Sequence, residues 1–488
     1  TVFAVMAFGG ALYGLTTAGT VELAAAFVYT GAAVGVSLAG DLLSLAVFWE
    51  VMAAASTVVI WAGGTAAARA AGLRYLMVHL MGGALLMAGV AMHAGATGSI
   101  AVGRIALDGP GAWLILAGVL VNAGAPPLSA WLPDAYPEAS PTGTVFLSAF
   151  TTKAAVYALL RAFAGEDLLV WIGLYMAFYG IIYALLENDA RRILSYSIIN
   201  QVGFMVAGAG IGTAMAVNGA AAHAFAHIIY KALLMMSAGA VLHATGRRKC
   251  TELGGLWRAM PVTAALGCVG ALSISAFPLT SGFVSKSMIG EAAAQDHLGA
   301  VWFLLTAASA GVFLHAGIKF PWFVFFNRDA GLRPPEAPRP MRLAMALFAV
   351  LCVGLGLWPQ PLYALLPYPV TFVPYTAAHV VSQLQLLLFS GLAFFVLLPA
   401  LRRTATLSLD WDWFYRRFAR LAWRELGLRG LRLGGALRLG AMRRLDRFIA
   451  EVARHNGPQG VLARTWPSGS TVLWVGALLA LYLVLYTL

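Results

Sequence analysis

The sequence predicts an all-α polytopic membrane protein with about fourteen transmembrane helices. Of its 488 residues, 60% are hydrophobic and only 11% are charged, and the mean hydropathy is +0.80. Soluble domains carry about 25% charged and about 45–50% apolar residues, so this composition excludes an ordinary water-soluble protein. Because one spanning helix needs roughly 20 apolar residues, the length leaves room for many spans and little mass outside the membrane.

Apolar stretches bounded by polar residues, proline or glycine mark the predicted spans. They are residues 1–19, 21–39, 42–62, 74–94, 112–131, 142–163, 168–187, 193–212, 218–243, 262–290, 298–326, 342–366, 377–400 and 471–488. The chain begins with Thr rather than Met and shows no signal peptide. We therefore expect it to be incomplete at its N-terminus.

Basic residues are distributed unequally between the two sides of these spans. Of the 32 Lys and Arg residues, 26 fall in alternate loops and in segment 402–467, whereas the intervening loops hold only Arg104 and Arg161. Basic loops stay on the cytoplasmic side. We therefore expect segment 402–467 to be cytoplasmic, both chain ends to face the other side, and the protein to lie in a bacterial inner membrane.

Segment 402–467 carries fourteen Arg against five acidic residues and holds most of the net charge of +12. In its second half, Arg443, Arg447 and Arg454 share one helical face and apolar residues lie opposite. We interpret it either as a helix along the membrane surface or along neighbouring subunits, or as a basic linker attracted to anionic lipid. Five glycines between 427 and 440 predict that it is not one long rigid helix. We expect lipid, and not nucleic acid, as its partner.

The sequence gives no sign of a metal centre or a cofactor. Cys250, Cys268 and Cys352 are scattered without the spacing of ligands or of a disulfide framework. No nucleotide, flavin, haem or iron–sulfur motif occurs. We expect no cofactor, no bound metal and no redox centre in this chain.

Charged residues inside the predicted spans are candidates for function. A charge at mid-bilayer costs about 2.5–3.5 kcal/mol on insertion scales, and Glu50, Lys153, Lys231 and Lys286 all fall near the middle or towards the end of apolar stretches. The alternative is that each is held by a structural interhelical hydrogen bond. Lys319 lies nearer the cytoplasmic end of its stretch, and we expect it either to reach the surface or to join the path.

Two histidines precede Lys231 at helical spacing. His223, His227 and Lys231 are four residues apart, which places them on one helix face. With Tyr230 beside them, such a column can relay protons, because histidine titrates near neutrality. The other histidines show no comparable grouping, and we predict no role for His79, His93, His243, His297 and His315.

Two predicted spans are interrupted by proline. Pro126 and Pro127 lie in the fifth span and Pro278 in the tenth, and Pro127 and Pro278 are 151 residues apart. Freed carbonyls inside a membrane are tolerated only where they are buried in protein or line a wet cavity. Paired broken helices indicate two related halves and a transport path, whereas the alternative is two unrelated kinks.

Five motifs resemble the antiporter-like family shared by Mrp-type multisubunit cation/proton antiporters and by proton-pumping subunits of respiratory complex I and membrane-bound hydrogenases. The likeness covers about residues 20–330 and is greatest to the Mrp D subunit. The Trp-Leu-Pro-Asp-Ala sequence at 131–135 is the most specific match. The motifs are Asp41–Met52, Trp131–Ala139, Phe150–Tyr157, His227–Leu234 and Pro278–Lys286.

The resemblance implies two inverted five-helix repeats, 21–163 and 168–326, each with a broken helix. The remaining parts would be an N-terminal transmembrane helix (1–20), C-terminal transmembrane helices (342–400), the surface or lateral segment (402–467) and a final transmembrane helix (471–488). The resemblance also implies roles: an essential glutamate, a lysine, a central relay and a terminal exchange site. In chain order these proton-transfer residues are Glu50, Lys153, His223, His227, Lys231 and Lys286.

Three departures from the family pattern bear on function. Asn122 stands where the family has a lysine, nine residues before Trp131, so Glu50 lacks its usual partner and the first half-channel either uses Lys153 or does not pump. Only two spans precede the Glu50 helix, where the family has four. Segment 402–467 resembles the lateral helix of the largest complex I antiporter protein.

The sequence thus predicts a proton-translocating subunit of a multisubunit Mrp-type Na⁺/H⁺ antiporter with other membrane subunits as partners. Two alternatives stay open: a proton-pumping subunit of a redox-driven complex, and a scaffold subunit with a degenerate first half. Protons are the expected transported species and Na⁺ is a candidate coupling ion.

Overall fold

The structure is a computed structural model that describes residues 1–399, 409–458, 460–461, 463–465 and 467–487. The chain divides into two compact units, Thr1–Asp412 and Trp413–Leu488. Residues 402–408, 459, 462 and 466 of the predicted basic segment lie outside the described residues, as do 400 and 488 of the neighbouring predicted helices.

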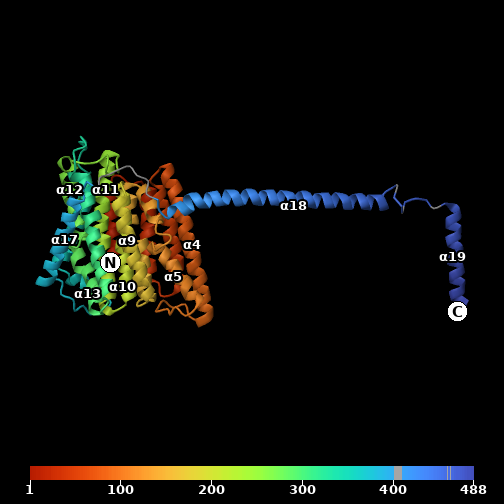
Figure 1. Cartoon of the computed structure of the whole chain (residues 1–488), viewed down its shortest axis with the longest axis horizontal. Helices are drawn as coiled ribbons and strands as arrows, with labels where there is room; N and C mark the ends of the chain where they lie inside the picture. The colour runs from red at the N-terminus through yellow and green to blue at the C-terminus, as the bar shows by residue number, and fades with distance from the viewer. Residues whose placement is uncertain (400–408, 459, 462, 466, 488) are drawn as a thin grey trace. The chain divides into compact units, whose positions relative to one another are not determined.

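The first unit is a helical bundle (Figure 1). Beyond two isolated bridges, its described residues form no strand. Its helices are α1 (Val2–Gly14), α2 (Thr20–Leu38), α3 (Leu42–Trp61), α4 (Ala66–Thr97), α5 (Pro110–Ala123), α6 (Trp131–Ala135), η1 (Tyr136–Glu138), α7 (Pro141–Leu147), α8 (Thr151–Ala162), α9 (Asp167–Leu186), α10 (Ala190–Ile211), α11 (Ala214–Thr245), η2 (Leu256–Arg258), α12 (Pro261–Ile274), α13 (Ser281–Gln295), α14 (Gly299–Val312), η3 (Phe313–Lys319), η4 (Trp322–Phe326), α15 (Arg339–Leu357), α16 (Gln360–Tyr363) and α17 (Ala377–Val396).

Eleven described helical stretches in the whole chain are long and apolar enough to cross a membrane, and α1, α5 and α12 are shorter apolar helices. The prediction of an all-α polytopic chain is confirmed. The number of fourteen crossing helices and the inverted repeats stay predictions.

Helix α10 and helix α11 form the interior of the bundle. Every residue in the apolar window of α10 is buried, and most of α11 is buried as well. Without a hydrophobic drive between helices in lipid, small residues allow the close approach that holds a membrane bundle together. A Cβ placed on Gly203 of α10 would lie 2.5 Å from the carbonyl oxygen of Gly173 in α9, so these two helices touch backbone to backbone.

The helices break at both places that the prolines predict. Helix α5 ends at Ala123, Gly124 adopts φ of +77°, and α6 begins at Trp131. Helix α12 ends at Ile274 and α13 begins at Ser281. Between them Ala276 and Leu279 have φ of 56° and 71°, a left-handed conformation that costs free energy for non-glycine residues and clusters at functional sites.

Two further irregularities have no counterpart in the predictions. The predicted span 142–163 is divided at 148–150 into α7 and α8. The predicted span 298–326 changes from α14 to π-helical turns over Phe313–Lys319 and Trp322–Phe326. Such π-helical turns are rare and occur mostly where function or strain requires them.

Residues 409–411, which follow the undescribed residues after α17, are held by tyrosines of α9 and α10. The Asp410 carboxylate accepts hydrogen bonds of 2.5 Å from Tyr179 and from Tyr196. Tyr183 donates to the carbonyl oxygen of Leu409 at 2.8 Å. We call this group the tyrosine clasp.

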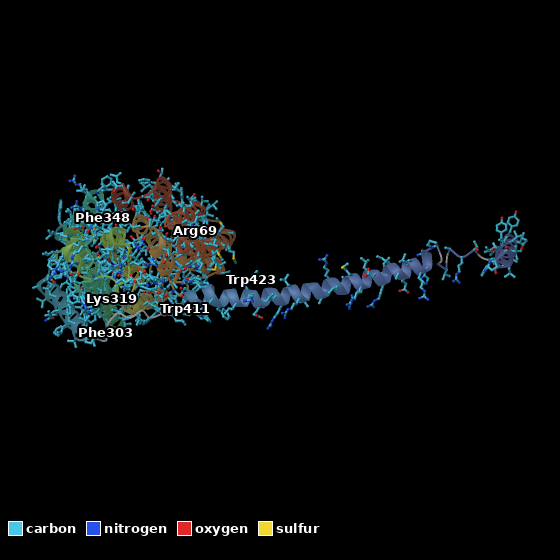
Figure 2. All side chains as sticks on the ribbon, turned by 90° about the horizontal axis from the view of Figure 1, so that it is seen from above. Arg69, Phe303, Lys319, Phe348, Trp411 and Trp423 are labelled. Atoms are coloured by element: carbon cyan, nitrogen blue, oxygen red, sulfur yellow. The ribbon has the colours of Figure 1, made fainter. Side chains whose placement is uncertain are left out.

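The second unit contains η5 (Phe414–Phe418), the 38-residue helix α18 (Ala419–Asn456) and α19 (Ser468–Thr487). The prediction that glycines interrupt this segment is wrong, because α18 is continuous through all five of them (Figure 1). Each glycine costs up to about 1 kcal/mol in a helix, but the Leu, Arg and Ala residues between them are strong helix formers. Trp423 of α18, labelled in Figure 2, packs against little else in its own unit and is 80% exposed.

Candidate functional site

The interior of the first unit contains several ionisable side chains. Lys153, Lys231 and Lys286 are at most 4% exposed. Glu50 is half-buried on α3. Because a buried ion must be hydrogen-bonded or paired, the partners of each group decide what it can do.

Lys153 lies on the first turn of α8, beside the unpredicted interruption. Its Nζ donates to the carbonyl oxygen of Ser148 at 2.6 Å and to the hydroxyl of Thr152 at 3.1 Å. The Ser148 carbonyl is free for this bond because the helix is interrupted there. The break therefore supplies the oxygen that holds the ammonium.

Lys231 lies at the centre of α11 and is completely buried. Its Nζ donates to the carbonyl oxygen of Leu194 at 3.1 Å and to the hydroxyl of Ser197 at 2.9 Å, both on α10. No carboxylate pairs with Lys153, Lys231 or Lys286 within the described residues.

His223 and His227 lie on α11 with Lys231, as the spacing predicts. His223 Nε2 lies 3.1 Å from Gln201 Oε1 and its Nδ1 lies 3.3 Å from Ser285 Oγ. The Tyr230 hydroxyl donates to the same Gln201 oxygen at 3.0 Å. Gln201 therefore joins the column to α10; it was not among the predicted site residues, although an amide in mid-span is a signal of its own.

Both ring nitrogens of His227 are buried without a partner among the residues placed by the structure. Its ring centroid lies 6.3 Å from that of His223 and 5.3 Å from that of Tyr230. Buried polar atoms in proteins are normally satisfied, by ordered water where protein groups do not reach. His227 is thus the member of the column whose nitrogens no described residue satisfies.

Lys286 lies on α13, just after the second broken helix. Its Nζ lies 3.5 Å from the carbonyl oxygen of Ile274, the last residue of α12, and 5.4 Å from the centroid of the Phe204 ring. It also lines a cavity of about 730 Å³ together with Glu291 and His379. Lys286 therefore combines a weak protein contact with access to open volume.

Glu50 has no hydrogen bond or ion pair with a described residue, and its carboxylate lies against α4. A Cβ on Gly83 would overlap Glu50 Oε1, so a larger residue there would displace the Glu50 carboxylate. Asn122 contacts His79 instead of Glu50, with 2.7 Å between Asn122 Oδ1 and His79 Nδ1. No role was predicted for His79, since nothing in the local sequence links it to residue 122.

Lys319 binds the C-terminal end of α9. It is fully buried, which contradicts the alternative that it reaches the surface. Its Nζ donates to the carbonyl oxygens of Ala184, of Leu185 at 2.9 Å and of Glu187 at 2.7 Å. A cation at this position satisfies the free carbonyls at the C-terminus of α9.

The carboxylates of the motif at 131–139 are held by Arg74 of α4 and by Arg248 of the loop after α11. Arg74 binds Asp134 at 2.7 Å, and Arg248 binds both Glu138 and Asp189 at 2.7 Å. Burial raises the pKa of the Asp189 carboxyl, while Arg248 and Arg191 oppose the rise. The motif is thus linked by ion pairs to α4 and to the loop after α11, and that loop is linked through Arg248 to the start of α10.

Pro126, Pro127 and Pro278 line the two helix breaks and carry no ionisable group. Pro278 is buried and Pro127 is exposed. Their contribution is the interruption itself, which frees the carbonyls near Lys286 and exposes the backbone between α5 and α6.

The fold and this interior define an integral membrane protein with ionisable groups in its core. A family model described as "NADH:quinone oxidoreductase/Mrp antiporter, TM" matches residues 39–313. The chain belongs to this family, and the predicted resemblance is confirmed.

Two curated relatives illustrate the likeness. The probable A/B subunit of a K⁺/H⁺ antiporter of Rhizobium meliloti is 31% identical over 68% of this chain and 36% of the relative. The D subunit of the Na⁺/H⁺ antiporter of Alkalihalophilus pseudofirmus is 35% identical over 52% of this chain and 55% of the relative. The chain thus spans about a third and about half of the lengths of these two proteins.

Solved structures share the fold. A chain of the Mrp complex from Dietzia sp. DQ12-45-1b matches 74% of this chain and 80% of its own length, with a TM-score of 0.69 and 23% identity. A chain of the membrane-bound sulfane sulfur reductase, an archaeal respiratory membrane complex, matches 99% of this chain and 87% of its own, with a TM-score of 0.70 and 23% identity.

Proposed function

We propose that this chain moves protons across the membrane as one component of a multisubunit Mrp-type Na⁺/H⁺ antiporter. The observation that carries the proposal is the row of buried lysines held by neutral oxygens alone among the described residues. The Ser197 hydroxyl can accept from the Lys231 ammonium and can donate to the amine. Such a site tolerates both protonation states, whereas a fixed carboxylate would bind the cation permanently.

The proposed path begins at Glu50 and passes through Lys153 to Lys231, His223 and His227, and then reaches Lys286. Three contacts support it. Gln201 joins His223 to α10, the unpartnered nitrogens of His227 suit a bound water, and Lys286 lines the large cavity. In this proposal the cavity provides exchange with the outer solution and the histidine column provides transfer within the bundle.

The remaining parts of the proposal follow from the relatives and the charge pattern. The coupling cation is Na⁺, and the partners are other membrane subunits of the same complex. The basic loops and the arginine-rich segment face the cytoplasm of a bacterial inner membrane, where the segment contacts anionic lipid or neighbouring subunits.

A second candidate is a proton-pumping subunit of a redox-driven complex. The long helix α18 with α19 after it favours this candidate, because the chain of the sulfur-reductase complex matches 99% of this chain. The identity of co-purifying subunits decides between the two. Small Mrp-type subunits support antiport, and iron–sulfur or quinone-binding subunits support redox pumping.

Everted membrane vesicles that contain the native complex test proton movement directly. We expect Lys231→Ala to abolish acidification of the vesicle interior, or the loss of an existing pH gradient when cation is added. The reason is that no other described amine contacts Ser197 and Leu194. Lys249→Ala is the matched control, since Lys249 is an exposed loop lysine paired only loosely with Glu252 at 3.8 Å. Normal coupling in Lys231→Ala vesicles would contradict the proposed path.

A further inference from the structure

His79 lies on α4, outside the row of residues proposed above. Of the two histidines on α4, it is the one nearer in sequence to Gly83, against which the Glu50 carboxylate lies. It is completely buried, and its ring packs at 4.0 Å from the Tyr75 ring and 4.5 Å from the Trp131 ring, measured between centroids. The packing fixes the ring plane and excludes rotation of the imidazole.

Asn122 sets which nitrogen of His79 carries the proton. The amide oxygen of Asn122 lies 2.7 Å from Nδ1, and an oxygen can only accept, so Nδ1 holds the hydrogen. The neutral ring then has Nε2 as an acceptor. Asn122 is therefore a positioning residue for this imidazole.

Nε2 of His79 is buried without a partner among the described residues, and so is Nδ2 of Asn122. An acceptor left unsatisfied in a bundle interior costs free energy and requires an explanation. The unsatisfied Nε2 is explained if it receives a proton, or a hydrogen bond from water, during function. If the position needed only an aromatic ring for packing, Phe would fill it without an unsatisfied acceptor.

Glu50 supplies a proton donor on one side of His79. Its carboxylate occupies the space of a side chain at Gly83, and residues 79 and 83 are one turn apart on the same face of α4, about 5–6 Å between Cβ positions. The Glu50 carboxylate thus lies beside the turn of α4 that follows His79.

Hydroxyl groups on the other side lead towards Lys153. Tyr75, one turn before His79, places its hydroxyl 2.9 Å from Ser56 Oγ and 3.3 Å from Thr151 Oγ1. Thr151 precedes Thr152, whose hydroxyl accepts from Lys153 Nζ. Tyr75, whose ring packs on His79, is thus hydrogen-bonded to Thr151 on the first turn of α8, the turn that also carries Lys153.

We propose that His79 is the proton carrier between Glu50 and Lys153. The first half of the path can then conduct protons although Asn122 stands where the family has a lysine. The Glu50 O–H bond breaks and an N–H bond forms at Nε2 through an intervening water, while the hydrogen on Nδ1 stays bonded to His79 and donates to Asn122 Oδ1. The Nε2–H bond then breaks, the Lys153 amine takes up the proton through water and becomes an ammonium, and the Glu50 carboxylate takes its next proton from water at the entrance of the path. The proposal rests on the proton movement proposed above.

The test uses the native complex in everted vesicles. His79→Gln keeps a hydrogen-bonding side chain without a titratable ring, and we expect its initial rate of proton movement to fall about tenfold or more, in the range of lost acid–base groups. His93→Gln on the same helix is the matched control and should leave the rate unchanged.

Rescue separates a carrier from a packing residue. Asn122→Lys in the His79→Gln background places a titratable amine at the position of the amide that binds His79 in the wild type. We expect it to restore at least about half of the rate. A loss that Asn122→Lys leaves unrestored assigns His79 to packing and overturns the proposal, as does a wild-type rate in His79→Gln.

If His79→Gln fails to assemble into the complex, a second variant tests the proposal. Asn122→Leu removes the acceptor of Nδ1–H without touching the ring, and we expect about a fivefold loss of rate; an unchanged rate overturns the proposal. Absence of proton movement in wild-type vesicles defeats the proposed function itself. Movement that Lys231→Ala blocks and His79→Gln leaves intact defeats only the role of His79.

Discussion

Lys153 and Lys286 are both held at interrupted helices, but their surroundings differ. Lys153 makes two hydrogen bonds of 2.6 and 3.1 Å in a closed interior, whereas Lys286 makes one bond of 3.5 Å and lines a cavity of about 730 Å³. A tightly held group passes its proton to protein neighbours, and a loosely held group beside open volume exchanges with water. On the proposed path we therefore expect internal transfer at Lys153 and exchange with water at Lys286.

The largest effect is expected at the closed site. Lys153→Met removes an amine that no cavity water replaces, so proton movement in vesicles should fall about 100-fold, as when an acid–base group is lost. Lys249→Met is the control. A residual rate close to wild type would show that the path does not pass through α8.

Glu50, the acid at which the proposed path begins, gives the next effect. Gly83→Ala places a Cβ in the space of Glu50 Oε1, and the displaced carboxylate should cost about 1–3 kcal/mol, or about tenfold in rate. Gly95→Ala on the same helix has nothing within 4 Å and should be silent in the same vesicle assay. Equal rates for the two variants would show that proton movement does not depend on the position of the Glu50 carboxylate.

A smaller effect is expected at the open site. Lys286→Met should lower the rate about fivefold, because water in the cavity takes over part of the exchange. If Lys286→Met is as inactive as Lys153→Met, the two sites do not differ in the way that their hydrogen bonds indicate.

Accessibility tests the same difference without a transport assay. In a Cys268→Ala background, a cysteine at Ser287, which lines the cavity, should react with a small water-soluble maleimide. A cysteine at Ser148, which is fully buried, should not. Mass spectrometry of the labelled chain measures both, and labelling at position 148 would break the comparison.

The smallest effect on transport is expected at Lys319, a buried lysine that closes a helix end. Lys319→Met leaves carbonyls of α9 unsatisfied, which should cost about 1–3 kcal/mol of stability, with little change in the transport rate per assembled complex. The midpoint of thermal unfolding in detergent measures the loss. A large loss of rate at unchanged stability would place Lys319 on the path.

How far the sequence predicts this structure depends on the range of the contacts involved. Composition and proline positions are local signals, and they predict the helical class and the two breaks at 124–129 and 276–282. The break at 148–150 contains neither Gly nor Pro. The amide of Thr151 donates to the hydroxyl of Tyr29 at 3.0 Å, a contact across 122 residues that no local pattern contains.

The candidate site shows the same division. The column of His223, His227 and Lys231 is visible from helical spacing, and the structure places all three on α11. His79 gives no comparable signal, because its partner Asn122 is 43 residues away. The prediction for helix α18 is wrong for a different reason, since the cost of each glycine does not outweigh the summed propensity of the residues between them.

The tyrosine clasp has a mechanical consequence. Tyr196 holds Asp410, and Ser197, the next residue of α10, holds the amine of Lys231. Neighbouring residues of a fully buried helix move as one body. The tyrosine clasp therefore anchors residue 410 to the same turn of α10 that binds the central lysine, so a residue just before the start of the second unit and the Lys231 site share one rigid support.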